Sequence, residues 1–176
     1  MVKVAKFFAY SAFFIVMLYL FFPKENLYYK MQESAAQYKV KVFENKIEEK
    51  LFSLDLLDGR LLYEGVEAAT FQKVEIMLLG FYNSVHVTSV TLSGLVKNFL
   101  PQKIERIDVS YSLVHPLEVR FWAKGDFGEA DGSYEIQKNK IMVNMHPSKV
   151  MQLRFRSSLR EFKKLKNGVY HYEKSL

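Results

Sequence analysis

The chain of 176 residues contains no cysteine, and its four histidines are scattered. The absence of cysteine excludes a disulfide framework, thiolate catalysis and cysteine-ligated metal. None of the histidines recurs at the i, i+3 or i+4 spacing of a helical metal site; they are His86, His115, His146 and His171. No P-loop, dinucleotide glycine fingerprint or nucleophile elbow is present. The sequence therefore predicts no catalytic residue, no metal and no cofactor, and we expect a protein that is not an enzyme.

Long apolar runs are also rare, with one exception near the start, KFFAYSAFFIVMLYLFFPKEN at residues 6–26. No charge lies between Phe7 and Phe22. A helix from Val4 to Pro23 would be roughly 30 Å long at about 1.5 Å per residue, which matches the hydrocarbon core of a bilayer. Such a helix has no polar face, whereas a helix at the surface of a soluble core has one. This run predicts a transmembrane helix.

The end of the apolar run distinguishes a permanent anchor from a cleaved signal peptide. A cleavage site requires small residues, but the run ends in the bulky residues Leu20, Phe21 and Phe22. We therefore favour an uncleaved signal anchor over residues 1–23, with a cleaved signal peptide as the alternative. Lys3 and Lys6 precede the run, which predicts an N-terminus on the cytoplasmic side. The expected location is a bacterial inner membrane, crossed once, with the rest of the chain in the periplasm.

Residues 24–37 predict a juxtamembrane helix or linker. Pro23 suits the first turn of a helix. Leu27, Met31 and Ala35 recur at i, i+4 and i+8, as on one helix face.

From residue 38 to residue 176 the apolar residues mostly alternate with polar ones, as in β-strands. YKVKVF begins the series, and LFSLDLLDGRLLYEG predicts a hairpin with its turn at Asp58-Gly59. KVEIMLLG and SVHVTSVTLSG predict a second hairpin, and a phase change predicts a bulge near Thr88-Ser89. IDVSYSL, LEVRFWAKGDFG and GSYEIQKNKIMVNM follow, the last with a tip at Lys138-Asn139. We expect a mainly β, periplasmic domain of eight or nine strands, built as a curled antiparallel sheet or a sandwich.

The oxygen-rich stretch GDFGEADGS contains Asp126, Glu129 and Asp131. It lacks the ligand spacing of an EF-hand, so we interpret it as a glycine-bounded turn with solvated acids.

The end of the chain is strongly basic. Residues 138–176 hold ten Lys and Arg against two acids, whereas the preceding residues carry a net charge of −2. We predict a short C-terminal helix from Ser157 to Lys166, ended by Asn167-Gly168; residues 150–156 fit a helix or a strand. Its apolar residues Phe155, Leu159 and Phe162 should dock on the sheet. The basic side chains form either a solvated face or a contact surface for anionic headgroups or an acidic partner; they are Arg154, Arg156, Arg160, Lys163 and Lys164. A nucleic-acid partner is not expected, because no recognition motif accompanies them.

The order of FFPKENL, LDLLDGRLLYEGV, VTLSG and IDVSYSLVHPLEVRFWAKGDFGEADGSYEI resembles the type II secretion protein N and AsmA-like group of envelope proteins. The size and layout are also similar to the LptC-type lipopolysaccharide-transport family. These resemblances imply one inner-membrane helix, a β-rich periplasmic part and no catalytic residue. Two functions follow as hypotheses. The domain is a component of a secretion or envelope-assembly complex that binds envelope proteins at its sheet edges, or it handles lipid by holding acyl chains on a curved sheet. A packed interior would favour the first hypothesis and an open apolar groove the second.

Overall fold

The computed structural model describes residues 2–21, 23–94, 96–166 and 168–176. One large antiparallel sheet dominates the fold, with a few helices around it. The helices are α1 (Val2–Leu20), α2 (Lys24–Gln37), the 3₁₀ helix η1 (Val96–Asn98) and α3 (Lys149–Arg154). The strands are β1 (Val40–Phe43), β2 (Lys46–Glu49), β3 (Ser53–Tyr63), β4 (Val66–Leu78), β5 (Tyr82–Leu92), β6 (Lys103–Ser112), β7 (Glu118–Gly125), β8 (Gly128–Glu135), β9 (Lys140–Pro147), β10 (Lys163–Lys164) and β11 (Tyr170–Ser175).

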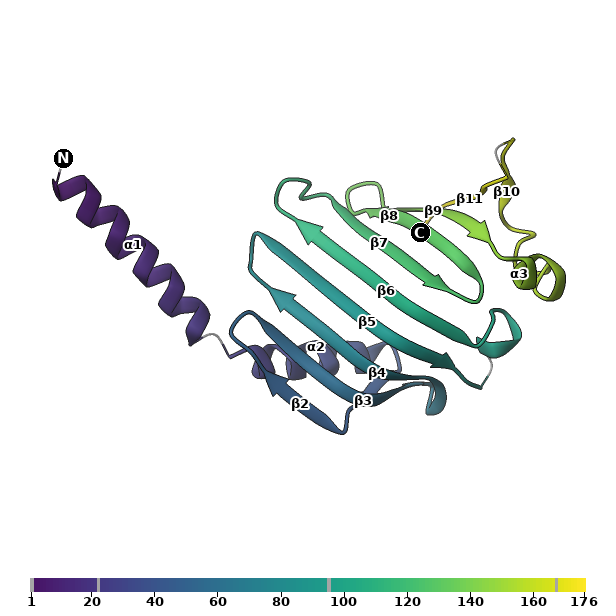
Figure 1. The fold of residues 1–176 in the computed structure, drawn as a ribbon, viewed down its shortest axis with the longest axis horizontal. Coiled ribbons are helices and arrows are strands. Elements are labelled where there is room, and N and C mark those ends of the chain that lie inside the picture. Colours follow the sequence, from purple (N-terminus) through teal and green to yellow (C-terminus); the bar gives the residue numbers. More distant parts are fainter. Residues whose placement is uncertain (1, 22, 95, 167) are drawn as a thin grey trace.

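The sheet is a meander in which each strand from β3 to β9 pairs with the next one along the chain (Figure 1). β1 and β2 both pair with β3, at its two ends, and β11 and β10 extend the sheet beyond β9. The expectation of a mainly β, antiparallel fold is confirmed. Of the two predicted forms, the structure is the single curled sheet rather than a sandwich.

The two faces of the sheet differ in chemistry. Residues directly opposite one another in antiparallel strands point to the same face. One row across the sheet is apolar apart from a glycine: Leu54, Ile76, Val85, Val109, Phe121, Gly132 and Val143. The neighbouring row on the other face is mostly polar: Asp55, Glu75, His86, Asp108, Trp122, Asp131 and Asn144. We call these the inner and outer faces.

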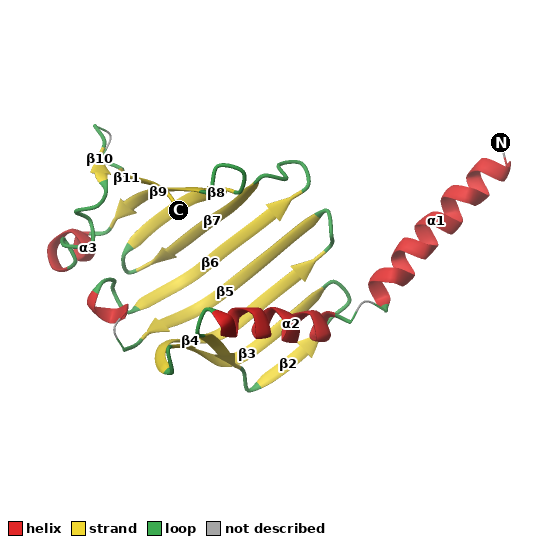
Figure 2. Ribbon diagram, turned by 180° about the vertical axis from the view of Figure 1, so that it is seen from behind, coloured by secondary structure: helices red, strands yellow, loops and turns green. Residues whose placement is uncertain are grey.

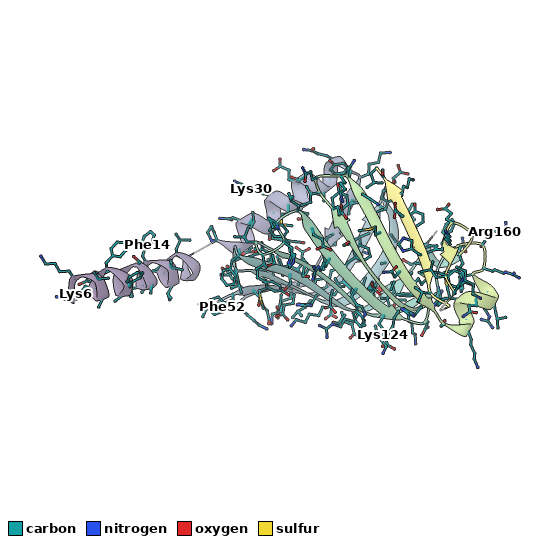
Figure 3. All side chains as sticks on the ribbon, turned by 90° about the horizontal axis from the view of Figure 1, so that it is seen from above. Lys6, Phe14, Lys30, Phe52, Lys124 and Arg160 are labelled. Carbon is teal, nitrogen blue, oxygen red and sulfur yellow. The ribbon has the colours of Figure 1, made fainter. Side chains whose placement is uncertain are left out.

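The sheet curls toward the side on which α2 lies, so the apolar inner face is concave (Figures 2 and 3). The Tyr28 side chain of α2 is buried in the core, and its hydroxyl donates a hydrogen bond to Glu44 at 2.8 Å. Burial, reinforced by this bond to a carboxylate, raises the pKa of Tyr28. The segment after α3 packs on the same core through Leu159, Phe155 and Phe162. The two ends of the chain thus cover different parts of the inner face and leave the middle less covered.

The predicted turn at Asp58-Gly59 is wrong. β3 runs through this point, and the ladder with β4 skips Asp58, which has a φ of +48°. The hairpin turn lies instead at Glu64-Gly65, where both residues have positive φ. The predicted bulge near Thr88-Ser89 is wrong. Ser89 has a φ of +54° and is unpaired in both ladders, but the register of β5 with β4 and with β6 is the same on either side of it, so no extra residue is inserted. Asp58, Gln72 and Ser89 are left unpaired at the same level of β3, β4 and β5 while the register is kept, so the three ladders are interrupted together.

The predicted helix from Ser157 to Lys166 is also wrong. The C-terminal helix is α3, whose first turn is capped by the Ser148 hydroxyl accepting from the Met151 N–H at 3.1 Å. Residues 156–161 form successive turns, and Ser158 donates its side-chain hydrogen bond to the carbonyl of Phe99. Gly168 lies in the turn between β10 and β11, and Asn167 lies outside the described residues. The predicted docking of Leu159 on the sheet is confirmed.

The N-terminal run forms α1, with Phe7, Phe8, Phe13 and Phe14 all exposed. Within the described residues, no helix combines the length and the apolar character needed to cross a membrane, so the predicted transmembrane segment is unsupported. Phe22, at the predicted exit of the run, lies outside the described residues. The helix predicted for residues 24–37 is confirmed as α2, and Pro23 occupies its N-cap.

Candidate functional site

An apolar groove lies between α2 and the inner face of the sheet. Met31 of α2 forms one wall, and the floor comes from β4, β5, β6 and β7. The groove has a volume of about 160 Å³. Its apolar floor residues include Ile76, Leu78, Val85, Val109, Tyr111 and Val119. Ligand sites are usually concave and mostly apolar, so the lining of this open groove suits an apolar ligand.

Beyond the groove the inner face continues as a half-buried apolar strip. From Val109 the row passes through Phe121 and Val143 to Tyr172, whose ring lies 5.3 Å from that of Phe162. The adjacent row adds Tyr134 and Ile141. With about 4.8 Å between strands, the strip from β5 to β9 is roughly 20 Å long. The C-terminal segment closes its far end through Phe162.

The outer face carries a hydrogen-bonded chain that the sequence did not predict. The Ser84 hydroxyl lies 3.2 Å from Nε2 of His86, and Nδ1 of His86 is hydrogen-bonded to Oδ1 of Asp108. Arg106 adds an ion pair to Asp108 at 2.7 Å. Burial alone would raise the pKa of Asp108, but the bonds from His86 and Arg106 outweigh it and hold the pKa below its usual range. Ser84 and His86 are two residues apart on one strand, so the sequence alone indicates that they share a face. Asp108 could not be assigned to this network from the sequence, because its position depends on the register between β5 and β6.

This Ser-His-Asp order resembles that of a hydrolase triad, but its surroundings do not suit catalysis. Ser84 is only 2% exposed, so a substrate carbonyl cannot reach its hydroxyl. Acyl transfer also needs N–H donors aimed at the developing oxyanion. β5 is paired on both sides, so its N–H groups at this point belong to the ladders with β4 and β6. We interpret the hydrogen bonds that link Ser84, His86 and Asp108 as a structural network.

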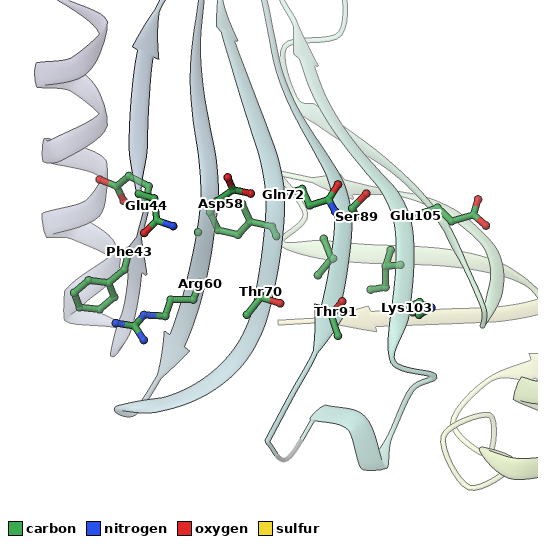
Figure 4. Close-up of a pocket in the computed structure, with 15 residues that line it drawn as sticks. Phe43, Glu44, Asp58, Arg60, Thr70, Gln72, Ser89, Thr91, Lys103 and Glu105 are labelled. Carbon is green, nitrogen blue, oxygen red and sulfur yellow. The ribbon is translucent and has the colours of Figure 1, made fainter.

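A second and wider hollow, of about 930 Å³, lies where the ladders skip residues on β3 to β6 (Figure 4). Asp58, Gln72, Ser89 and Glu105 are the skipped residues, and all four are exposed. The labelled side chains are spread over several strands and do not point at a common centre (Figure 4). The guanidinium of Arg60 lies instead over the ring of Phe43, at 5.5 Å. The hollow is an open bend of the sheet rather than a focused polar site.

The five predicted contact residues, Arg154, Arg156, Arg160, Lys163 and Lys164, are all exposed. They follow one another through α3, the turns and β10. Lys164 places its ammonium 5.6 Å from the centre of the Tyr170 ring. Figure 3 shows Arg160 at the opposite end of the molecule from Phe14 and Lys6 of α1. This arrangement separates the basic surface from the apolar helix.

The acidic stretch is a turn, as predicted: Gly125 and Gly128 pair across it, and Gly128 has a φ of +112°. Glu129 pairs with Lys124 at 3.2 Å, and Asp131 accepts a hydrogen bond from Asn144. Among the described residues, no three His, Asp or Glu side chains gather in a group that could hold a metal ion.

Comparison with known proteins gives no family: no protein-family model, curated protein or solved structure matches the chain. The resemblances stated from the sequence therefore stay predictions.

Proposed function

We propose that the protein is a non-enzymatic lipid-handling protein that holds an acyl chain on the concave face of its sheet. The observation that carries this proposal is the open apolar groove between Met31 and the inner face of β4 to β7. An open groove distinguishes lipid handling from a purely structural role, because exposed apolar surface usually marks a binding site and a packed scaffold does not require it.

The dimensions and chemistry of the inner face support an acyl chain as the ligand. The strip that continues the groove is about 20 Å long. One leaflet of a bilayer is roughly 15 Å thick in its hydrocarbon part, so an extended acyl chain fits along the strip. Valine, phenylalanine and tyrosine dominate the strip, and the charged rows lie on the outer face.

We also propose that α1 anchors the protein in a bacterial inner membrane, with the N-terminus cytoplasmic and the sheet in the periplasm. The support is the exposure of its large apolar side chains, among them Phe14 at 66%. Such a surface costs free energy in water and is stabilised by hydrocarbon. Lys3 and Lys6 precede the apolar stretch and favour a cytoplasmic N-terminus.

The rival function, a component of a secretion or envelope-assembly complex, stays a prediction. It would use a sheet edge to bind a partner strand. β2, at one edge, has four residues, three of them charged: Lys46, Glu48 and Glu49. Short and charged strands are the usual protection of an edge against pairing, so the edges do not favour this function over lipid handling.

The test is binding of a fluorescent fatty acid to the full chain in detergent, with the signal of protein-free micelles subtracted. Val119→Trp should fill the groove and weaken binding at least several-fold. The matched control is Thr91→Trp, which adds the same ring to an exposed position of β5 on the outer face and should bind as the unmodified chain does. No binding by the unmodified chain, or equal loss in both variants, would contradict the proposal.

A further inference from the structure

Four loops lie together at one end of the strands. Ser53, Met77, Ser84, Ser110, Arg120, Ser133 and Met142 form one row across the sheet. The loops 50–52, 79–81, 113–117 and 136–139 all lie just beyond this row. Backbone hydrogen bonds join each to its neighbour: Leu78 to Phe52, Leu113 to Phe81, Ile136 to Leu117, and Leu176 to Asn139. We call these four loops, with Leu176, the rim.

The rim exposes apolar side chains, and none of its side chains is acidic. Its exposed large apolar residues are Leu51, Phe52, Phe81, Leu113, Val114, Leu117, Ile136 and Leu176. The four loops contain two lysines and no Asp or Glu. The opposite end of the sheet also exposes apolar side chains such as Tyr63 and Phe99, but Glu64 and Asp126 lie in its turns. An acid-free apolar surface suits a bilayer, whose headgroups are often anionic.

The rim lies on the side from which α1 leaves the sheet. Lys24, the first residue of α2, pairs with Glu49 at 3.0 Å, and the rim begins at the next residue along the chain. Only four residue steps separate Leu20 from Lys24, a distance of at most roughly 14 Å. α1 projects from this same side of the sheet in Figure 1. A bilayer that holds α1 is therefore close to the rim and far from the basic C-terminal end.

We infer that the rim inserts into the surface of the bilayer that anchors α1, and that the groove opens onto that surface. This inference rests on the proposed membrane anchoring. Leu78 and Tyr111 of the groove floor lie within two residues of the rim loops. An acyl chain that leaves the bilayer at the rim meets the groove without crossing water. The lipid would therefore come from the bilayer into which the rim is inserted.

The test uses single cysteines, which are specific labels because the chain has no cysteine of its own. Val114→Cys probes the rim, Phe99→Cys the opposite end, and Phe14→Cys the anchor. Val114 is 80% exposed and Phe99 62%, so neither label disturbs the core. Each variant of the full chain, carrying a polarity-sensitive fluorophore, is reconstituted into vesicles of phosphatidylethanolamine and phosphatidylglycerol that contain nitroxide lipids.

We expect quenching and a blue shift at Val114 and Phe14 but not at Phe99. Quenching at Phe14 without quenching at Val114 would contradict insertion of the rim while still supporting anchoring by α1. Equal quenching at Val114 and Phe99 would overturn it too, because the sheet would then have no preferred end. Quenching at Val114 without Phe14 would support the rim and contradict the anchor. Fatty-acid binding in detergent is measured separately, so the failure of the groove remains distinguishable from the failure of the rim.

Discussion

Lys24 of α2 is buried against the edge of the sheet, with 2% of its side chain exposed and its Nζ 3.0 Å from Oε1 of Glu49. A buried ammonium has lost its hydration and depends on its protein partners. This pair fixes the start of α2 to the end of β2, and hence the place where α1 leaves the sheet.

Removing the acid of this pair should cost more than removing the base. Glu49→Gln takes one carboxylate away from the buried ammonium, and we expect a loss of about 1–3 kcal/mol in the free energy of unfolding. Lys24→Met removes the charge itself and should cost less. Denaturant unfolding of the full chain in detergent measures both. The control is Glu48→Gln, whose partner Lys46 is exposed. A larger loss for Lys24→Met than for Glu49→Gln would contradict this account.

A second buried charge makes stability depend on pH. Asp55 is 2% exposed; Lys50 and Lys73 lie 2.6 and 3.0 Å from its Oδ2, and its Oδ1 has no hydrogen-bond partner among the described residues. Burial alone would raise the pKa of Asp55, but the two lysines outweigh it and hold the pKa below its usual value. The ionised carboxylate therefore stabilises the fold above the unfolded pKa of about 4, and this contribution is lost as pH falls through the lower folded pKa.

We expect Asp55→Asn to cost about 1–3 kcal/mol at pH 7. The gap in the free energy of unfolding between the variant and the unmodified chain should narrow below a pH of about 4, where the carboxylate of the unfolded chain becomes protonated while the native one is still ionised. Unfolding measured over a pH series checks this. Asp58→Asn, at an exposed position, is the control for the loss of one carboxylate. A gap for Asp55→Asn that does not change with pH would show that the lysine pairs contribute little.

Gly59 is required by a close contact rather than by a turn. A β-carbon at this position would lie 2.2 Å from the ring of Phe71 and 2.7 Å from the carbonyl oxygen of Phe43. We expect Gly59→Ala to cost about 1–3 kcal/mol through overpacking. In a Phe71→Leu background part of this cost should disappear, because the ring is no longer there. Gly65→Ala, which meets nothing within 4 Å but has a φ of +81°, should cost about 1 kcal/mol in either background. An unchanged cost of Gly59→Ala would mean that the ring is not the cause.

The sequence could not show which of two acid-glycine pairs, Asp58-Gly59 or Glu64-Gly65, forms the hairpin turn. Both are acid-glycine pairs in apolar surroundings, so local chemistry predicts a turn at either. The choice is made by the neighbouring strand: β3 keeps one register with β4 from Leu57 to Gly59, so the chain continues past the unpaired Asp58 as a strand. The strands at β6 to β9 were predictable because their alternation and their turn residues agree. The C-terminal helix was not, since the same apolar residues dock through turns when Ser158 bonds to the distant carbonyl of Phe99.

Only one wall of the groove could be predicted from the sequence. Met31 was visible on a helix face, but the strands opposite it depend on how far the sheet curls. The strand alternation identified the apolar face and not its concave shape, which follows from twist and bulges accumulated over many strands.

The Ser84 hydroxyl of the hydrogen-bonded Ser84-His86-Asp108 network should not react with electrophilic probes. Ser84 is buried, so we expect no labelling by a fluorophosphonate probe, in contrast to a hydrolase serine activated by its histidine. Peptide mapping by mass spectrometry after incubation with the probe checks this. Because the chain has 15 other serine and threonine residues, the labelled site must be located. Labelling of Ser84 that disappears in His86→Gln would establish an active triad and overturn the non-enzymatic proposal.

The basic C-terminal residues should contribute nothing to binding of the membrane that holds α1. They are exposed and lie at the end of the molecule opposite Phe14 (Figure 3). Electrostatic attraction to headgroups fades within a Debye length, roughly 8–10 Å at physiological salt. We therefore expect the triple variant Arg156→Gln, Arg160→Gln, Lys163→Gln to float with anionic vesicles as the unmodified chain does, at low and at high salt. Lys138→Gln, in the rim, is the matched variant that should weaken binding at low salt only. Weaker flotation of the triple variant at low salt would place the basic end at the headgroups and would overturn the orientation argued from the rim.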